Sequence, residues 1–219
     1  MASQTEVVNI ALGRIGITRR LADVLTDSTK EALQARLIYD TALDETLRLF
    51  PWNFALTSVQ LAETAEDVVV PGYDYQYQYP TNCLQAHAVC DEDGLRYTYE
   101  AWATAWESTR MLPPRYPFRV ALHPNGDRRV ILSDLEDAYL IYTARVTDTA
   151  VWDPLFTSAF AWKLAYELAM PLVEGSEGMR RQQQAAQGYA NALQSAMAQS
   201  FNESVEDERP QSPSILSRE

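Results

Sequence analysis

The chain has 219 residues, 47% of them hydrophobic and 22% charged, which is enough to bury a sizeable core in one domain or in a domain with an insertion. A formal net charge of −12 argues against a protein whose main function is to bind nucleic acid, because such binding depends on Lys and Arg neutralising phosphates. No apolar stretch reaches the roughly 20 residues that span a bilayer and the N-terminal residues lack a secretory pattern, so we expect a protein without a membrane segment, kept in a cytoplasm until assembly.

The N-terminal part of the chain has the pattern of two helices. Ser3 and Glu6 have the spacing of a capping box, and the apolar stripe that follows them ends near Gly16. Ser28 and Glu31 repeat that spacing ahead of a second helical run. We therefore predict a capping box at the start of each helix.

The second helix is expected to run from Glu31 to Phe50 and to stop at Pro51, whose nitrogen carries no proton for the helical hydrogen bond. Two large aromatic residues, Trp52 and Phe54, follow at the point where the chain must turn. Because large aromatic side chains mostly serve burial, we expect both of them to anchor the core.

The middle of the chain, residues 54–152, has the pattern of a β-rich insertion. From Tyr73 to Tyr79, tyrosine alternates strictly with other residues, as in a half-exposed strand. Asn125 and Gly126 predict a hairpin with antiparallel strands, because both turn positions favour positive φ. The other expected strands are Ala55–Leu61, Gln85–Val89, Arg96–Ala101, Phe118–Leu122, Arg128–Leu132 and Ala138–Val146.

Two further helices are predicted after the insertion. Asp153 and Pro154 suit an N-cap and a first helical position, and few polar residues follow before Pro171, so this helix should be buried nearly all round. Ser176 precedes the fourth helix. The expected apolar stripe of that helix consists of Ala186, Tyr189, Ala190, Leu193, Met197 and Phe201.

These elements predict an α+β fold. The N-terminal helices, residues 1–53, and the C-terminal helices, residues 153–201, can share one core, so we predict a four-helix bundle interrupted by the antiparallel β-rich insertion at residues 54–152. Residues 202–219 are polar, acidic and without periodicity, which predicts an extended or disordered C-terminal tail.

Several short motifs are spread over most of residues 1–200. They are Ala11-Leu12-Gly13-Arg14-Ile15-Gly16 in the first helix, Tyr39 and Leu43 to Leu47 in the second, Phe50-Pro51-Trp52-Asn53-Phe54-Ala55 after it, Tyr77-Gln78-Tyr79-Pro80-Thr81-Asn82-Cys83-Leu84 in the insertion, and Asp153-Pro154-Leu155-Phe156 at the third helix. Together they resemble the tail tubular protein A-like head-to-tail adaptors of short-tailed bacteriophages. Asn82 departs from that pattern, since aspartate is expected there.

The resemblance implies a structural virion protein of the neck, with no enzymatic activity and no cofactor. Such subunits assemble in the host cytoplasm as a ring, expected to be a dodecamer, below the portal protein, and continue the DNA channel into the tail tube or nozzle protein. The family's C-terminal extension seats on the portal, so the expected docking residues are Pro210, Pro213, Ile215 and Leu216. An acidic lumen would repel phosphates and let double-stranded DNA slide without sequence-specific binding.

The alternating tyrosines Tyr73, Tyr75, Tyr77 and Tyr79 are interpreted as a subunit or tail interface, where aromatic residues are enriched. Together with Trp102 and Trp106 they could instead be a stacking platform for single-stranded nucleic acid. That alternative lacks its basic groove, because the nearby arginines are interleaved with acidic residues. The interface is therefore the preferred interpretation.

An enzyme remains the alternative function. Some phage tail components hydrolyse peptidoglycan, and such activity would require two carboxylates about 5–9.5 Å apart in a sugar-binding cleft. Asp91, Glu92 and Asp93 near Glu100 are the candidates, although a solvated acidic turn is the preferred interpretation of these residues. The chain has no recognisable nucleophile motif and no glycine-rich phosphate loop.

A zinc site is the other chemical alternative. Cys83, His87, Cys90 and His123 would supply four nitrogen and sulfur ligands. Their spacing matches no common zinc finger, and two cysteines are too few for a disulfide framework. We therefore expect no metal and two reduced thiols.

Overall fold

The computed structural model describes residues 2–65, 68–95 and 116–202, which form a mixed α+β fold with two small antiparallel sheets. The chain divides into two compact units. Unit 1 consists of Met1–Ser58, Pro80–His87 and Ile141–Ser200, and unit 2 contains Val59–Tyr79 and Ala88–Leu140. Residues 80–87 and 141–152, which the sequence assigned to the β-rich insertion, thus belong to the same unit as the helices.

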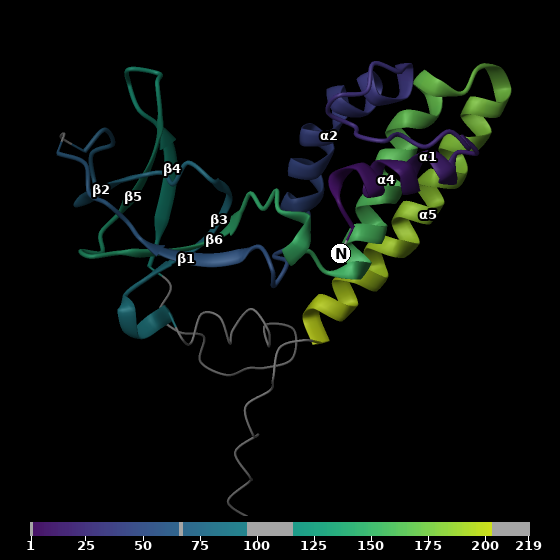
Figure 1. Ribbon diagram of the computed structural model, residues 1–219. Coiled ribbons are helices and arrows are strands. Elements are labelled where there is room, and N and C mark those ends of the chain that lie inside the picture. Colours follow the sequence, from purple (N-terminus) through teal and green to yellow (C-terminus); the bar gives the residue numbers. More distant parts are fainter. Residues whose placement is uncertain (1, 66–67, 96–115, 203–219) are drawn as a thin grey trace, which may run out of the picture. The chain divides into compact units, whose positions relative to one another are not determined.

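Along the chain, helices come first, the strands follow, and helices return at the end of the described part (Figure 1). The helices are α1 (Gln4–Arg14), α2 (Lys30–Arg48), the 3₁₀-helix η1 (Thr149–Val151), α4 (Pro154–Leu172) and α5 (Gly175–Asn202). The strands are β1 (Leu56–Gln60), β2 (Tyr75–Gln78), β3 (Cys83–Cys90), β4 (Phe118–Leu122), β5 (Arg129–Ser133) and β6 (Tyr139–Ala144). These strands confirm all the expected ones except Arg96–Ala101, which lies outside the described residues.

The first two helices begin at different kinds of cap. At α1 the predicted capping box is confirmed, because the hydroxyl of Ser3 accepts from the backbone of Glu6 at 3.2 Å and the carboxylate of Glu6 accepts from the backbone of Ser3 at 2.7 Å. At α2 the predicted box is wrong. Thr29, not Ser28, is the N-cap. The backbone N–H of Thr29 donates to the carboxylate of Asp27 at 2.9 Å, and the Thr29 hydroxyl accepts from the backbone of Ala32 in the first turn.

Helix α4 lies at the centre of unit 1. Asp153 caps it as predicted, accepting from the backbones of Leu155 at 2.7 Å and Phe156 at 3.1 Å. The helix packs against both α1 and α2, and none of residues 156–169 is exposed, which confirms burial nearly all round. It continues through Pro171 to Leu172, because a proline in the last turn removes only one hydrogen bond.

Helix α5 packs against α4 through small side chains. A Cβ atom added to Gly188 would lie 2.7–2.8 Å from ring atoms of Trp162, so the indole of α4 lies directly on the backbone of α5 here. The fully buried residues along α5 include Ala185, Ala196 and Ser200. Of the predicted stripe, Ala186, Tyr189, Leu193 and Met197 are half-buried, and the last two pack against the core. Ala190 is exposed, so the prediction is wrong at this position, and the side chain of Phe201 lies outside the described part.

Unit 2 contains the three-stranded sheet β2-β5-β4, with β5 in the centre and both neighbours antiparallel to it. The predicted hairpin joins β4 to β5, and the backbone N–H of Gly126, at φ 74°, donates to the carbonyl of His123 at 2.8 Å. Asn125 does not take the predicted positive φ. Pro124 and Asn125 are the two central residues of this turn. Type I turns favour proline at the first central position and have a negative φ at the second.

The second sheet has the order β1-β6-β3. Each of its strands contributes residues to both units, because the chain passes from one unit to the other within β1, β3 and β6.

The first turn of α5 carries a cluster of ion pairs that makes stability depend on pH. Glu177 accepts hydrogen bonds from Arg180 at 2.7 and 2.9 Å and from Arg181 at 2.8 Å. These bonds lower the pKa of Glu177 from 4.5 to about 2. A carboxylate with a lowered folded-state pKa stabilises the fold fully above its unfolded pKa, and this stabilisation disappears as the pH falls through the folded value.

The Glu177→Gln variant should therefore melt below the wild type at neutral pH, and the difference in Tm should shrink between pH 4.5 and pH 2. Thermal melts of both proteins across this range measure the difference. A gap that stays constant down to pH 2 would mean that the charge of Glu177 contributes nothing to stability.

Candidate assembly site

The segment after α2, residues 49–55, is the centre of the candidate site. The side chain of Trp52 is 1% exposed, and its indole Nε1 donates to the carbonyl of Thr46 at 3.1 Å. The carbonyl of Trp52 in turn accepts from the backbones of Ala55 at 2.9 Å and Leu56 at 2.8 Å. The helix end and the entry to β1 are thus both fixed by one residue.

The aromatic residues of this segment join α2 to the start of α4. The Trp52 ring lies edge-on to Phe156, with 5.0 Å between centroids, and the half-buried Phe54 lies 4.8 Å from the same ring. Phe156 also contacts Trp152 at 5.3 Å. The prediction that Trp52 is a core anchor is confirmed, and Phe54 packs at the edge of the same core.

Asn53 links this segment to the last turn of α5. Its backbone N–H donates to the hydroxyl of Ser200 at 3.2 Å, and its side-chain amide donates to the carbonyl of Ser200. The sequence interpretation gave Asn53 no role. The only available signal was a single polar amide between two aromatic residues, and nothing in the sequence pointed to its partner.

The acidic residues of α2 on the side facing the rest of unit 1 are paired. Arg145 binds Asp44 at 2.6 Å and Asp40 at 2.8 Å, while Lys163 of α4 binds Glu45 at 2.8 Å. Lys163 also binds Glu167 at 2.7 Å. Burial alone would lower the pKa of Lys163, but its bonds to the two glutamates outweigh burial and raise it.

The tyrosines of the predicted interface differ in their burial. Tyr77 is 2% exposed, and its hydroxyl donates to the carbonyl of Leu135 at 2.5 Å, so this ring belongs to the core of unit 2. Gln76, on the opposite face of β2, is buried as well, because its amide donates to Thr64 at 2.9 Å and accepts from Val69 at 3.0 Å. The strand is therefore not half-exposed at its centre.

The other three tyrosines keep part of their surface in contact with solvent. Tyr75 stacks on Tyr77 with 6.3 Å between ring centroids, and the guanidinium of Arg129 lies 3.9 Å from the centre of the Tyr79 ring. Tyr73, Tyr75 and Tyr79 are half-buried. An interface at these three residues stays a prediction.

The predicted portal-docking residues lie outside the described part of the chain, as do two tryptophans and one carboxylate considered for the alternatives. They are Pro210, Pro213, Ile215, Leu216, Trp102, Trp106 and Glu100. Of the remaining carboxylates, Asp91 accepts hydrogen bonds from the backbone of Gly94 at 2.6 Å and the hydroxyl of Tyr116 at 3.3 Å. Its described role is to hold a turn of unit 2.

The residues considered for zinc have other partners or are buried. The ring nitrogen Nε2 of His87 lies 2.7 Å from the hydroxyl of Thr143, and burial lowers the pKa of this histidine. Cys83 and Cys90 are both buried. The described residues contain no cluster of three or more His, Cys, Asp or Glu side chains arranged for a metal ion.

The described helices all fall short of the combination of length and apolarity that crossing a bilayer requires. The sequence matches no protein-family model and no curated protein. The resemblance to head-to-tail adaptors therefore rests on the short sequence motifs alone.

Proposed function

We propose that this protein is a structural head-to-tail adaptor subunit of a short-tailed bacteriophage. Copies of it form a ring below the portal protein, expected to be a dodecamer, and extend the DNA channel towards the tail tube or nozzle protein. Helices α1, α2, α4 and α5 form the four-helix bundle of the subunit, and double-stranded DNA passes through the ring without sequence-specific binding.

One observation supports this proposal above the others. The motif that carries the family resemblance most strongly, residues 50–55, holds three helices of unit 1 together: Trp52 contacts the end of α2 and the start of α4, and Asn53 binds the last turn of α5. A motif with this structural role is what a rigid ring subunit needs, because side-by-side packing in a ring requires a body of fixed shape.

The charge of the chain is compatible with a DNA channel. A net charge of −12 gives phosphates little to bind, so DNA inside the ring would pass without sticking. The C-terminal segment supplies the docking arm, in which Ile215 and Leu216 are the apolar contacts with the portal.

Native mass spectrometry of the full chain, alone and mixed with portal rings from the same genome, tests the proposal. We expect a defined multi-copy assembly on the portal ring, with one mass and no ladder of partial rings at saturation. Absence of association with the portal at every concentration and salt condition would contradict the adaptor function.

A variant that ends at Pro210 serves as the control for the docking arm. It should keep the Tm of the full chain but bind the portal more weakly, because it lacks Ile215 and Leu216. Unchanged binding would remove the tail from the proposal and leave the adaptor function standing.

A further inference from the structure

The outward face of α5 carries no charged side chain over most of its length. From Gln182 to Asn202 the helix contains no Asp, Glu, Lys or Arg, although 22% of the chain is charged. A helix with a solvated face normally carries charged residues on it. The exposed residues of this stretch, here called the α5 amide face, are Gln183, Gln184, Gln187, Ala190, Asn191, Gln194, Ser195, Ala198 and Gln199.

Helix α2 has an exposed apolar face. Leu33 and Leu37 lie one turn apart and are 53% and 74% exposed. Of the charged residues beside this pair, Lys30 is exposed one turn before Leu33, Arg36 donates to the carbonyl of Leu25, and Asp40 binds Arg145 at 2.8 Å. We call Leu33 and Leu37 the α2 leucine face.

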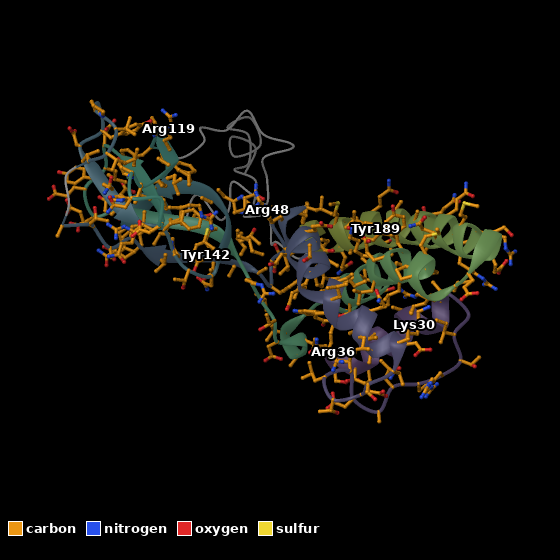
Figure 2. All side chains as sticks on the ribbon, turned by 90° about the horizontal axis from the view of Figure 1, so that it is seen from above. Lys30, Arg36, Arg48, Arg119, Tyr142 and Tyr189 are labelled. Atoms are coloured by element: carbon orange, nitrogen blue, oxygen red, sulfur yellow. The ribbon has the colours of Figure 1, made fainter. Side chains whose placement is uncertain are left out.

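These two faces belong to one body and point in different directions. Both helices pack against α4, and α5 also meets the C-terminal part of α2, where Tyr189 hydrogen-bonds to Thr46. In Figure 2, Lys30 and Arg36 of α2 lie on one side of the helical unit and Tyr189 of α5 on the other. Two different surfaces on opposite sides of a subunit permit a head-to-tail contact that repeats from copy to copy.

The charge of the chain restricts how two copies can meet. Each copy carries a net charge of −12, so copies repel one another overall, and unpaired acidic groups facing each other in a contact would add to that repulsion. Burying charged side chains in a contact also costs desolvation, which neutral amides and leucines largely avoid. Leucine side chains fit between the small residues of the amide face, such as Ala190 and Ala198, while the glutamines around them keep hydrogen-bonding capacity at the rim.

We propose that the α2 leucine face of one copy packs on the α5 amide face of the next copy. The contact is heterologous, and its repetition closes the ring. This inference rests on the proposed function, because it names the surfaces through which the ring subunits join.

Disulfide cross-linking between introduced cysteines tests the contact directly. The full-length double variant Leu37→Cys with Gln187→Cys carries one cysteine on each face, and the native Cys83 and Cys90 are both buried. Under mild oxidation this variant should give a ladder of covalent multimers on a non-reducing gel. Each single variant should stay monomeric, and an equimolar mixture of the two single variants should stop at covalent dimers.

The matched control moves the first cysteine from position 37 to a position in unit 2 where the native leucine has a similar exposure. Leu122 is 64% exposed on β4, so the double variant Leu122→Cys with Gln187→Cys has the same chemistry on a different surface. It should give no ladder. Cross-linking is carried out at the highest concentration that the protein reaches, because a covalent bond traps contacts that are too weak to survive dilution.

Each outcome has a defined meaning for the inference and for the proposed function. Dimers from a single variant would show an isologous contact and overturn the inference. Rings seen by native mass spectrometry without a ladder from the double variant would overturn it while supporting the adaptor function. A ladder from a protein that never binds the portal would support the contact and contradict the adaptor function. The absence of both ladder and self-association would overturn the contact, leaving portal binding to decide the function.

Discussion

Replacing Trp52 by alanine should lower the free energy of unfolding by about 3–5 kcal/mol, the usual cost of emptying a buried tryptophan site. The ring is 1% exposed and lies between the end of α2 and Phe156 of α4, so its removal leaves a cavity that these helices cannot easily close. The indole donor to the carbonyl of Thr46 is lost as well. Denaturant unfolding followed by circular dichroism measures the change.

The variant Trp52→Phe separates the two contributions. Phenylalanine keeps part of the ring volume but has no N–H, so the carbonyl of Thr46 keeps only the backbone donor of Leu49 at 3.4 Å, at a cost of about 0.5–1.5 kcal/mol. We expect Trp52→Phe to lie between the wild type and Trp52→Ala. A loss below about 1 kcal/mol for Trp52→Ala would mean that the site collapses without a cavity and that the residue is not an anchor.

Local signals in the sequence predicted this part of the fold because they need no tertiary information. Pro51 disfavours continuation of the helix before it, and a large aromatic residue beside the resulting turn has few ways to avoid burial. Asp153 with Pro154 is equally local, and the cap forms as predicted. Ser28 and Thr29 show where this reasoning ends: both are good N-caps, and the bond from the backbone of Thr29 to Asp27 decides between them.

Apolar periodicity was less reliable, because it shows which residues could be buried but not which helix face meets a neighbour. On α5 the predicted Ala190 is exposed, whereas Ala185, which lay outside the predicted stripe, is buried. The packing partner decides this, because burial depends on which side of α5 meets α4. Tyr77 illustrates the same point in a strand: strict alternation predicted one solvated face, but loop residues cover both faces at its centre.

The candidate site was predictable only in part for the same reason. The anchoring role of Trp52 follows from its own chemistry and its place after a helix. The bond between Asn53 and Ser200 joins residues far apart in the sequence, and neither residue type indicates the other. The two uncharged faces of unit 1 become visible only when exposure is known, because a run of Gln and Ala is compatible with either side of a helix.

Replacing Gly188 by alanine should destabilise the protein by up to about 2 kcal/mol, because overpacking costs of about 1–3 kcal/mol offset and exceed the gain in helix propensity of about 1 kcal/mol. The added methyl group would meet three atoms of the Trp162 ring at 2.7–2.8 Å. The ring is held on another side by the guanidinium of Arg14 at 4.2 Å, which itself binds Ser158 at 2.8 and 3.0 Å. The indole therefore has little room to move aside.

Gly13→Ala is the matched control, since it makes the same chemical change in α1 where nothing lies within 4 Å of the added Cβ. It should raise the free energy of unfolding by about 0.4–1 kcal/mol. The effect of Gly188→Ala should become neutral or stabilising in a Trp162→Ala background, because the clashing ring is then absent and the two sites are energetically coupled. A loss that persists in that background would place the constraint outside the contact between α4 and α5. The orientation of the α5 amide face would then depend on some other contact of the helix.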